Sequence, residues 1–259
     1  MTNTSEMPTV PRPGRSPDPS QVRVPPSIVD EALFRPVRSG NAFEDTVARL
    51  LQTIRLGIVE PGEALPAERD LAARFSVSRD TVREAIRELA DAGYLVSKRG
   101  RYGGTFVTET LPAVAVSGVP LDAAEIEDVL GLRDILEIGA VRAVAAKSLS
   151  AHDRDFLWSR LRESVAADSA DYRRLDSRLH LAIGELAGTP SLVPLLADNR
   201  TRVNELLDSI PSLGRNIAHS NEQHEAIVVA ILTGDAERAA AAMREHLEGS
   251  AALLRGFLA

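Results

Sequence analysis

The segment from Pro61 to Val96, PGEALPAERDLAARFSVSRDTVREAIRELADAGYLV, constrains the fold of this chain more than any other stretch. It contains a short helical pattern, AERDLAARF, then a turn at Ser76 to Ser78, and then a second helical pattern from about Arg79 to Ala92. The second pattern has apolar residues at i, i+3, i+4 and i+7, which predict one buried face: Val82, Ala85, Ile86 and Leu89. Another helical period precedes the segment, beginning at about Phe43 and ending by Gly57.

The residues that flank the second pattern predict how it begins and ends. Ser78 is a favourable N-cap, and Gly93 is placed to end the helix in a left-handed conformation. Two predicted strands follow, Tyr94–Ser97 and Thr105–Thr108, joined by KRGRYGG, a loop rich in glycine and positive charge. The order helix, helix, helix, hairpin predicts a winged helix-turn-helix domain over residues 41–110.

Arginines lie opposite the apolar stripe of the second helix. Arg79 and Arg83 are at its start, the part that meets base edges when a recognition helix enters the major groove. A guanidinium there can bond guanine O6 and N7, and Thr81 can add a methyl or hydroxyl contact. The alternative is a solvated helix face with i, i+4 ion pairs, which applies most to Arg87 because glutamates stand beside it.

The distribution of charge supports a DNA-contacting surface in this region. Residues 69–101 contain eight Lys/Arg and five Asp/Glu, a net charge of +3, although the whole chain has a net charge of -7. Further cations are predicted to reach phosphates or the minor groove: Arg69, Lys98, Arg99 and Arg101. Residues 41–110 as a whole have a net charge of -1, so one such domain attracts phosphate weakly and we expect a dimer.

The segment resembles the DNA-binding domain of GntR-type bacterial transcription regulators. The resemblance is carried by the Pro61–Val96 stretch followed by GGTFV, within about residues 43–108. It implies that Arg69, Arg79 and Arg83 contact operator DNA and that the glycine-rich wing tip enters the minor groove. The wing is RYGGTFV, longer than the G-x-G-T-F-V of the family. The predicted DNA-binding residues are Arg69, Ser78, Arg79, Thr81, Arg83, Lys98, Arg101, Gly103 and Gly104.

The rest of the chain divides into three parts. Residues 1–40 contain eight of the fifteen prolines and are predicted to be a disordered arm. Residues 111–121, with two prolines and a glycine, are predicted to be a linker. Helical patterns then continue to the end, over residues 123–147, 151–166, 170–187, 191–209, 217–232 and 236–258, with a break near Gly131 left open. We therefore predict a mainly α protein whose residues 122–259 form an antiparallel all-α helical bundle.

A cluster of candidate metal ligands falls within this predicted bundle. Asp176 and His180 are four residues apart on one predicted helix, so their side chains share a face. His224 and His246 lie in the last two predicted helices. Three imidazoles and a carboxylate can bind a divalent ion such as zinc, nickel or manganese and leave positions open for a ligand. The alternative is an ordinary polar role, as expected for His219 in the loop-like RNIAHSN.

The helical half resembles the FCD domain, the ligand-binding domain of the FadR subfamily. The matching stretches are LRDILEIGAVRAVAA, the D-x-x-x-H at Asp176 and His180, and EQHEAIVVAILTGDAERAAAAMREHL. The resemblance implies that Asp176 and the three histidines bind a metal and that carboxylate effectors ligate it. Arg133 is a candidate effector-binding residue. An intrahelical ion pair with Glu137 is an equal alternative for it.

Together these patterns predict a cytoplasmic, homodimeric transcription regulator that acts as a repressor. It would bind a palindromic double-stranded DNA operator and sense a small organic acid at the metal. The absence of cysteine, of a secretory signal and of a membrane-spanning apolar run fits this prediction. Two other hypotheses stay open: a metal-dependent hydrolase with Glu222 or Glu225 as acid or base, and an architectural DNA-binding protein with a structural metal.

Overall fold

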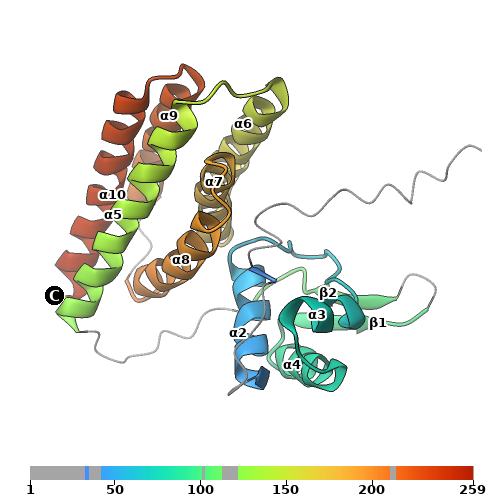
Figure 1. The fold of residues 1–259 in the computed structure, drawn as a ribbon. Helices are drawn as coiled ribbons and strands as arrows, with labels where there is room; N and C mark the ends of the chain where they lie inside the picture. The colour runs from blue at the N-terminus through green and yellow to red at the C-terminus, as the bar shows by residue number, and fades with distance from the viewer. Residues whose placement is uncertain (1–32, 35–41, 101–102, 113–121, 211–213, 259) are drawn as a thin grey trace, which may run out of the picture.

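The computed structural model describes residues 33–34, 42–100, 103–112, 122–210 and 214–258 (Figure 1). The N-terminal unit consists of α2 (Ala42–Arg55), α3 (Glu68–Phe75), α4 (Arg79–Asp91), β1 (Leu95–Lys98) and β2 (Gly104–Val107). The C-terminal unit consists of α5 (Ala123–Ala145), α6 (Ala151–Ala166), α7 (Tyr172–Leu186), α8 (Leu192–Asp208), α9 (Gly214–Leu232) and α10 (Ala236–Leu258). The predicted fold class, a winged helix-turn-helix followed by a helical bundle, is confirmed. Most of the predicted arm and linker lies outside the described residues.

The winged helix-turn-helix is held together by the capping residues and by one apolar core. The Ser78 side chain accepts the Thr81 N–H at 3.0 Å at the start of α4. Gly93 follows α4 with a φ of 83°, a left-handed conformation that costs glycine little. Tyr94 donates its N–H to Leu89 at the end of α4, so β1 begins at Leu95, one residue later than predicted. The buried faces of α3 and α4 pack with α2 and the wing in a single core cluster.

The wing is a two-stranded antiparallel hairpin with an additional backbone contact at its edge. Leu95 pairs with Val107 and Lys98 pairs with Gly104. The segment before α3 extends this pairing, because Leu65 donates its N–H to Thr105 at 2.8 Å. The wing is therefore anchored to the start of the helix-turn-helix on its open edge.

In the helical bundle, α10 packs against α5 and α9, and α7 lies between α6 and α8 (Figure 1). Helix α5 continues without a break through Gly131, where a side chain would meet only open space. Helix α9 begins at Gly214, before the predicted start at residue 217, and it contains His219, so the loop-like interpretation of RNIAHSN is wrong. His219 is exposed on this helix, whereas Asn216, Ser220 and Asn221 are half-buried. Among the described residues, every helix is too short or too polar to span a bilayer.

Helix α2 joins the two units through contacts with α8. Arg49 donates to Asp198 at 3.0 Å, and Gln52 donates to Asp198 at 3.1 Å and to Thr201 at 3.0 Å. Leu56 is fully buried in an apolar cluster shared with α5, α7 and α8. Polar and apolar contacts therefore both connect the DNA-binding unit to the bundle.

Candidate metal centre and DNA-binding surface

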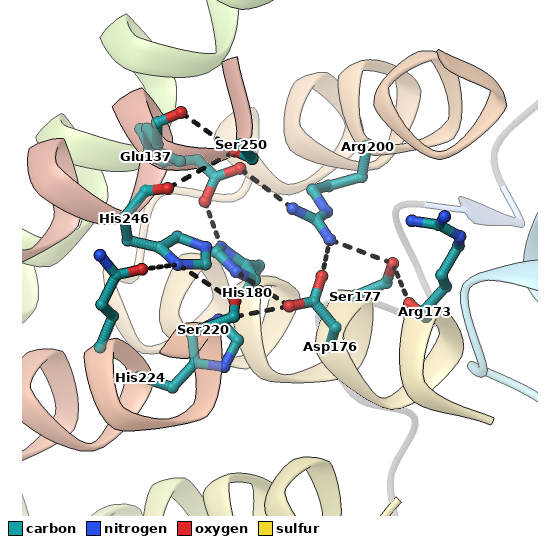
Figure 2. Close-up of polar contacts among 12 residues, drawn as sticks. Glu137, Arg173, Asp176, Ser177, His180, Arg200, Ser220, His224, His246 and Ser250 are labelled. Atoms are coloured by element: carbon teal, nitrogen blue, oxygen red, sulfur yellow. Dashed lines mark hydrogen bonds and ion pairs between the residues drawn. The ribbon is translucent and has the colours of Figure 1, made fainter. Parts of the chain in front are cut away.

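The four predicted metal ligands meet at one point inside the bundle (Figure 2). Asp176 and His180 come from α7, His224 comes from α9 and His246 comes from α10. One ligand atom from each lies within 4.8 Å of the others, and all four residues are buried. Tertiary packing thus brings together residues up to 70 positions apart in the sequence, with the donor set that divalent transition metals prefer.

Unpartnered imidazole nitrogens indicate that the cluster is suited to a metal. Nε2 of His246 and Nδ1 of His224 are buried without a hydrogen-bond partner among the described residues, and Nε2 of His180 and of His224 make no hydrogen bond there and face only the Asp176 carboxylate. Leaving such groups unsatisfied costs about 1–3 kcal/mol each. The Nε2 of His224 lies 3.2 Å from Oδ1 of Asp176. A cation between these atoms would accept their lone pairs, so the residues present fit a metal ion.

A surrounding layer of polar residues holds the ligands in position (Figure 2). His180 donates through Nδ1 to Glu137, and Arg200 donates to Oδ2 of Asp176. Nδ1 of His246 lies 3.3 Å from the side-chain oxygen of Gln223. Hydrogen bonds of this kind, between a surrounding residue and a metal ligand, fix the orientation of the ligand's side chain.

Glu137 and Arg200 were not predicted as part of the centre. The sequence patterns indicate Glu137 only as an ion-pair partner for Arg133, and they assign no role to Arg200. The available signal was that Arg200 lies on the buried face of α8, between Leu196 and Val203 at helical spacing. A charged residue in an apolar stripe requires a buried partner, but periodicity alone cannot say which one.

Charge and burial have opposite effects on the pKa values of the centre. Burial acts to raise the pKa of Asp176, but the charges of Arg200 and His180, together with polar contacts from His180 and His224, outweigh it and hold that pKa well below its usual range. Burial lowers the pKa of His224 and, more strongly, that of His246. The pKa of His180 is raised, because the charges of Glu137 and Asp176 and the polar contact with Asp176 together outweigh burial. The cluster thus combines an ionised carboxylate with two imidazoles that favour the neutral form, His224 and His246, and a metal would compete with a proton at His180.

A cavity of about 220 Å³ opens next to the metal cluster. Its lining includes Arg133, Tyr172, His246 and Ser250. Arg133 donates to Glu137 at 3.2 Å and to Ser250 at 2.7 Å, so the ion pair considered for it exists and the residue also borders the cavity. The buried hydroxyl of Tyr172 makes no hydrogen bond with the described residues. An effector-binding role for Arg133 stays a prediction.

The predicted DNA-reading residues lie on the exposed face of α4. Arg79 is exposed at its first position. Arg83 makes ion pairs with Glu68 at 3.2 Å and with Asp80 at 3.1 Å. Among the described residues, the ion pairs that were expected mainly for Arg87 are therefore found at Arg83. Thr81 and Ser78 are linked by hydrogen bonds at the helix start. These roles in DNA binding stay predictions.

The predicted wing contacts are equally exposed where the structure describes them. Lys98 lies over the Phe106 ring at 4.6 Å. Gly103 is exposed, and a Cβ there would come within 2.5 Å of the Lys98 carbonyl oxygen, which explains the glycine. Gly104 begins β2, and the side chain of Arg69 is 78% exposed. Arg101 lies outside the described residues.

The fold and the site together define a winged-helix DNA-binding domain attached to a helical domain with a buried Asp/His cluster that could hold a metal. Residues 43–107 match the model of the bacterial regulatory proteins of the gntR family, and residues 128–249 match the FCD domain. A protein of Escherichia coli K12 named for regulation of an L-lactate dehydrogenase operon is 31% identical over 229 residues, 83% of this chain and 86% of that protein. The chain belongs to the GntR family of bacterial transcription regulators and carries an FCD domain.

Further similarities agree with this assignment. LutR of Bacillus subtilis is 29% identical over 217 residues, 79% of this chain and 97% of LutR. RmpR of Mycobacterium gastri is 30% identical over 172 residues, and the match spans 62% of its length. The solved structure of McbR/YncC of E. coli has the same fold, with a TM-score of 0.53 at 19% identity, over 83% of this chain and 97% of that one. The three sequence relatives are named as regulators, so the chain is a DNA-binding transcription regulator and the hydrolase hypothesis is set aside.

Proposed function

We propose that the protein is a repressor that binds a palindromic operator as a homodimer and responds to a small organic acid. The acid would bind beside a divalent metal held by Asp176, His180, His224 and His246. The observation that carries this proposal is the set of buried, unpartnered imidazole nitrogens at the end of a cavity. An apolar or fully hydrogen-bonded core would contain no such atoms.

The metal centre would supply one anchor for the effector and the protein would supply the others. A zinc, nickel or manganese ion can accept a carboxylate oxygen as a further ligand. Arg133 and the Tyr172 hydroxyl are in the cavity lining, where they can donate hydrogen bonds to the effector. A volume of about 220 Å³ favours a small acid. The name of the E. coli relative, which refers to L-lactate dehydrogenase, supports this choice of effector class.

The DNA-binding unit would read the operator through α4 and the wing. Arg79 and Arg83 would bond guanine edges in the major groove, and Arg69 and Lys98 would contact phosphates or the minor groove. Arg83 would first give up its pairs with Glu68 and Asp80. Because residues 41–110 have a net charge of -1, two such units on two half-sites are needed for firm binding.

Helix α8 offers a route from the metal centre to the DNA-binding unit. Its Arg200 bonds Asp176, and its Asp198 and Thr201 bond α2 through Arg49 and Gln52. An effector that shifted α8 would therefore change the position of α2 relative to the bundle. Regulation requires the effector to have different affinities for the two arrangements of the DNA-binding units.

The test combines metal binding with operator binding. Zinc, nickel and manganese are added in turn to protein treated with a chelator, and the melting temperature is followed with and without a panel of small hydroxy and keto acids. We expect a metal to raise the melting temperature and one acid to raise it further only when metal is present. The same acid should weaken binding to an operator selected from a random DNA pool.

Two variants make the test specific. His224→Ala should abolish both increases in melting temperature, whereas His152→Ala, at an exposed position of α6 outside the lining of the cavity, should leave them unchanged. If chelation changed neither the melting nor the response to any acid, the metal-linked sensor would be wrong. A metal effect combined with operator affinity that ignored every acid would instead favour the architectural hypothesis.

A further inference from the structure

A second cavity, of about 480 Å³, lies where the DNA-binding unit meets the bundle. Its walls come from both units: Arg55, Leu56 and Tyr94 from the first, and Arg174 and Asn204 from α7 and α8. Its volume is within the range of metabolite-binding pockets, whereas the cavity beside the metal is at the small end. This junction cavity is separate from the metal ligands, none of which line it.

The junction cavity contains cationic donors without partners. The side chain of Arg174 is only 10% exposed, and one of its nitrogens pairs with Asp171 at 3.1 Å. Its Nε and Nη1 are buried and make no hydrogen bond with the described residues. Arg55 donates to the Tyr94 hydroxyl at 3.2 Å, and its Nε is likewise buried without a partner. Buried guanidinium groups with open donor positions are suited to a carboxylate or a phosphate.

The acidic residues at this cavity leave the unpartnered donor atoms of Arg174 and Arg55 available to a ligand. Asp208 is paired with Arg173 at 2.6 Å. Glu205 is exposed at the rim. The amide oxygen of Asn204 is buried without a partner and can accept a hydrogen bond from a ligand. The remainder of the lining is largely apolar: Leu56, Tyr94, Leu111, Pro112 and Ile210.

We propose that the junction cavity binds an organic anion with a compact carboxylate or phosphate group and an apolar body. The anionic group would accept hydrogen bonds from Arg174 and Arg55, and the apolar body would lie against Tyr94 and Leu111. Because the two arginines come from different units, the ligand holds the DNA-binding unit against the bundle. Its binding is therefore coupled to DNA binding, and each changes the affinity of the other by the same factor.

The test is calorimetric titration of the full-length, metal-loaded chain in a chloride buffer. The probes are benzoate, phenyl phosphate and inorganic phosphate, which separate carboxylate from phosphate and charge from apolar contact. The titrations are repeated in His246→Ala, which disables the cavity beside the metal, so their outcome does not depend on the proposed sensor site. We expect one benzoate or phenyl phosphate per chain in both proteins, and weaker binding of inorganic phosphate.

Variants at the junction locate the site. Arg174→Leu and Arg55→Leu should each weaken binding by about tenfold, because each removes a charge-assisted hydrogen bond. Arg202→Leu removes the same charge from the exposed side of α8, where Arg202 faces Asp128 at 3.6 Å, and should leave binding unchanged. Asn204→Asp places a carboxylate among the donors and should also weaken binding, which provides a second variant if Arg174→Leu fails to fold by circular dichroism.

Two results would overturn the proposal. One is that neither aromatic anion binds His246→Ala at millimolar concentration. The other is that binding there is the same within twofold in Arg55→Leu and Asn204→Asp as in the unmodified background. Inorganic phosphate binding as tightly as phenyl phosphate would contradict the assignment of an apolar body to the ligand.

Discussion

Arginine–carboxylate pairs occur in both units of this protein, in opposite environments. In the DNA-binding unit, Arg83 pairs with Glu68 and Asp80 while its side chain is 54% exposed. In the bundle, Arg200 is fully buried beside Asp176 and Glu137. An exposed pair contributes about 0–1 kcal/mol and exchanges partners readily. A buried pair is costly to break, so the first kind can yield to DNA while the second holds a site rigid.

The largest effect is expected from breaking the buried pair. Arg200→Met leaves Asp176 buried without its arginine partner, although Glu137 keeps Arg133 and His180, and we expect the free energy of unfolding to fall by about 3–5 kcal/mol in urea titrations. Arg202→Met, two residues along the same helix and exposed, should change it by less than about 0.5 kcal/mol. A loss below about 1 kcal/mol for Arg200→Met would show that the buried pair behaves like a surface pair.

The exposed arginines should affect binding and leave stability unchanged. Arg79→Ala is expected to weaken binding to a selected operator by about 1–3 kcal/mol, through loss of a guanine contact. Its melting temperature should stay unchanged, because the side chain is exposed. Fluorescence anisotropy with operator and with random DNA measures the difference, and Arg162→Ala on the bundle surface is the matched control. Equal losses on both DNAs would make Arg79 a phosphate contact.

The rigidity of the connection between the two units can be tested by comparing a glycine-to-alanine substitution at two positions. Gly57, directly after α2, has a φ of 69°, and a Cβ there would come within 2.8 Å of the side chains of Arg174 and Arg178. We expect Gly57→Ala to cost about 1–2 kcal/mol of unfolding free energy. Gly131→Ala, in open space within α5, should instead stabilise by about 1 kcal/mol. A neutral or stabilising Gly57→Ala would show that this junction adapts freely.

The smallest effect is expected from an exposed ion pair on the bundle. It tests whether the contribution of an ion pair to stability depends on its solvent exposure or on the domain in which it lies. The hydrogen bond from Arg255 lowers the pKa of Glu127 below its ordinary 4.5. A depressed folded-state pKa stabilises above the ordinary pKa, and that contribution is lost as the pH falls through the lowered value. In an NMR titration, Arg255→Gln should return the midpoint to the ordinary range without a measurable change in melting. An unchanged midpoint would contradict the paired geometry, in which the two hydrogen bonds from Arg255 to Glu127 are 2.6 and 2.8 Å long.

Most of the winged helix-turn-helix was predictable, because its signals are local. The Ser78 cap, the Gly93 terminus and the apolar stripe of α4 each depend on residues within about one or two helical turns. Local signals failed around His219, where polar composition resembled a loop although the residues belong to helix α9. Polar residues on one face are compatible with either conformation until the packing of the other face is known.

The metal ligands were predictable only as a set of suitable residue types with a family resemblance. Spacing placed Asp176 and His180 on one face of a helix, but it could not place His224 and His246 beside them. Nor could it indicate Arg200 as the partner of Asp176, since that contact joins two helices. Side chains on different helices meet according to crossing geometry and packing, which local periodicity does not encode.

The amino-acid sequence by itself determined the helices, their caps, the exposed arginine face of α4 and the chemistry available for a metal. These properties follow from backbone conformation and side-chain type over a few neighbouring residues. Only the tertiary structure decided which buried charges meet and that a cavity with open guanidinium groups lies between the units. The physical reason is that burying a charge is favourable only beside a specific partner, and that partner comes from a distant part of the chain.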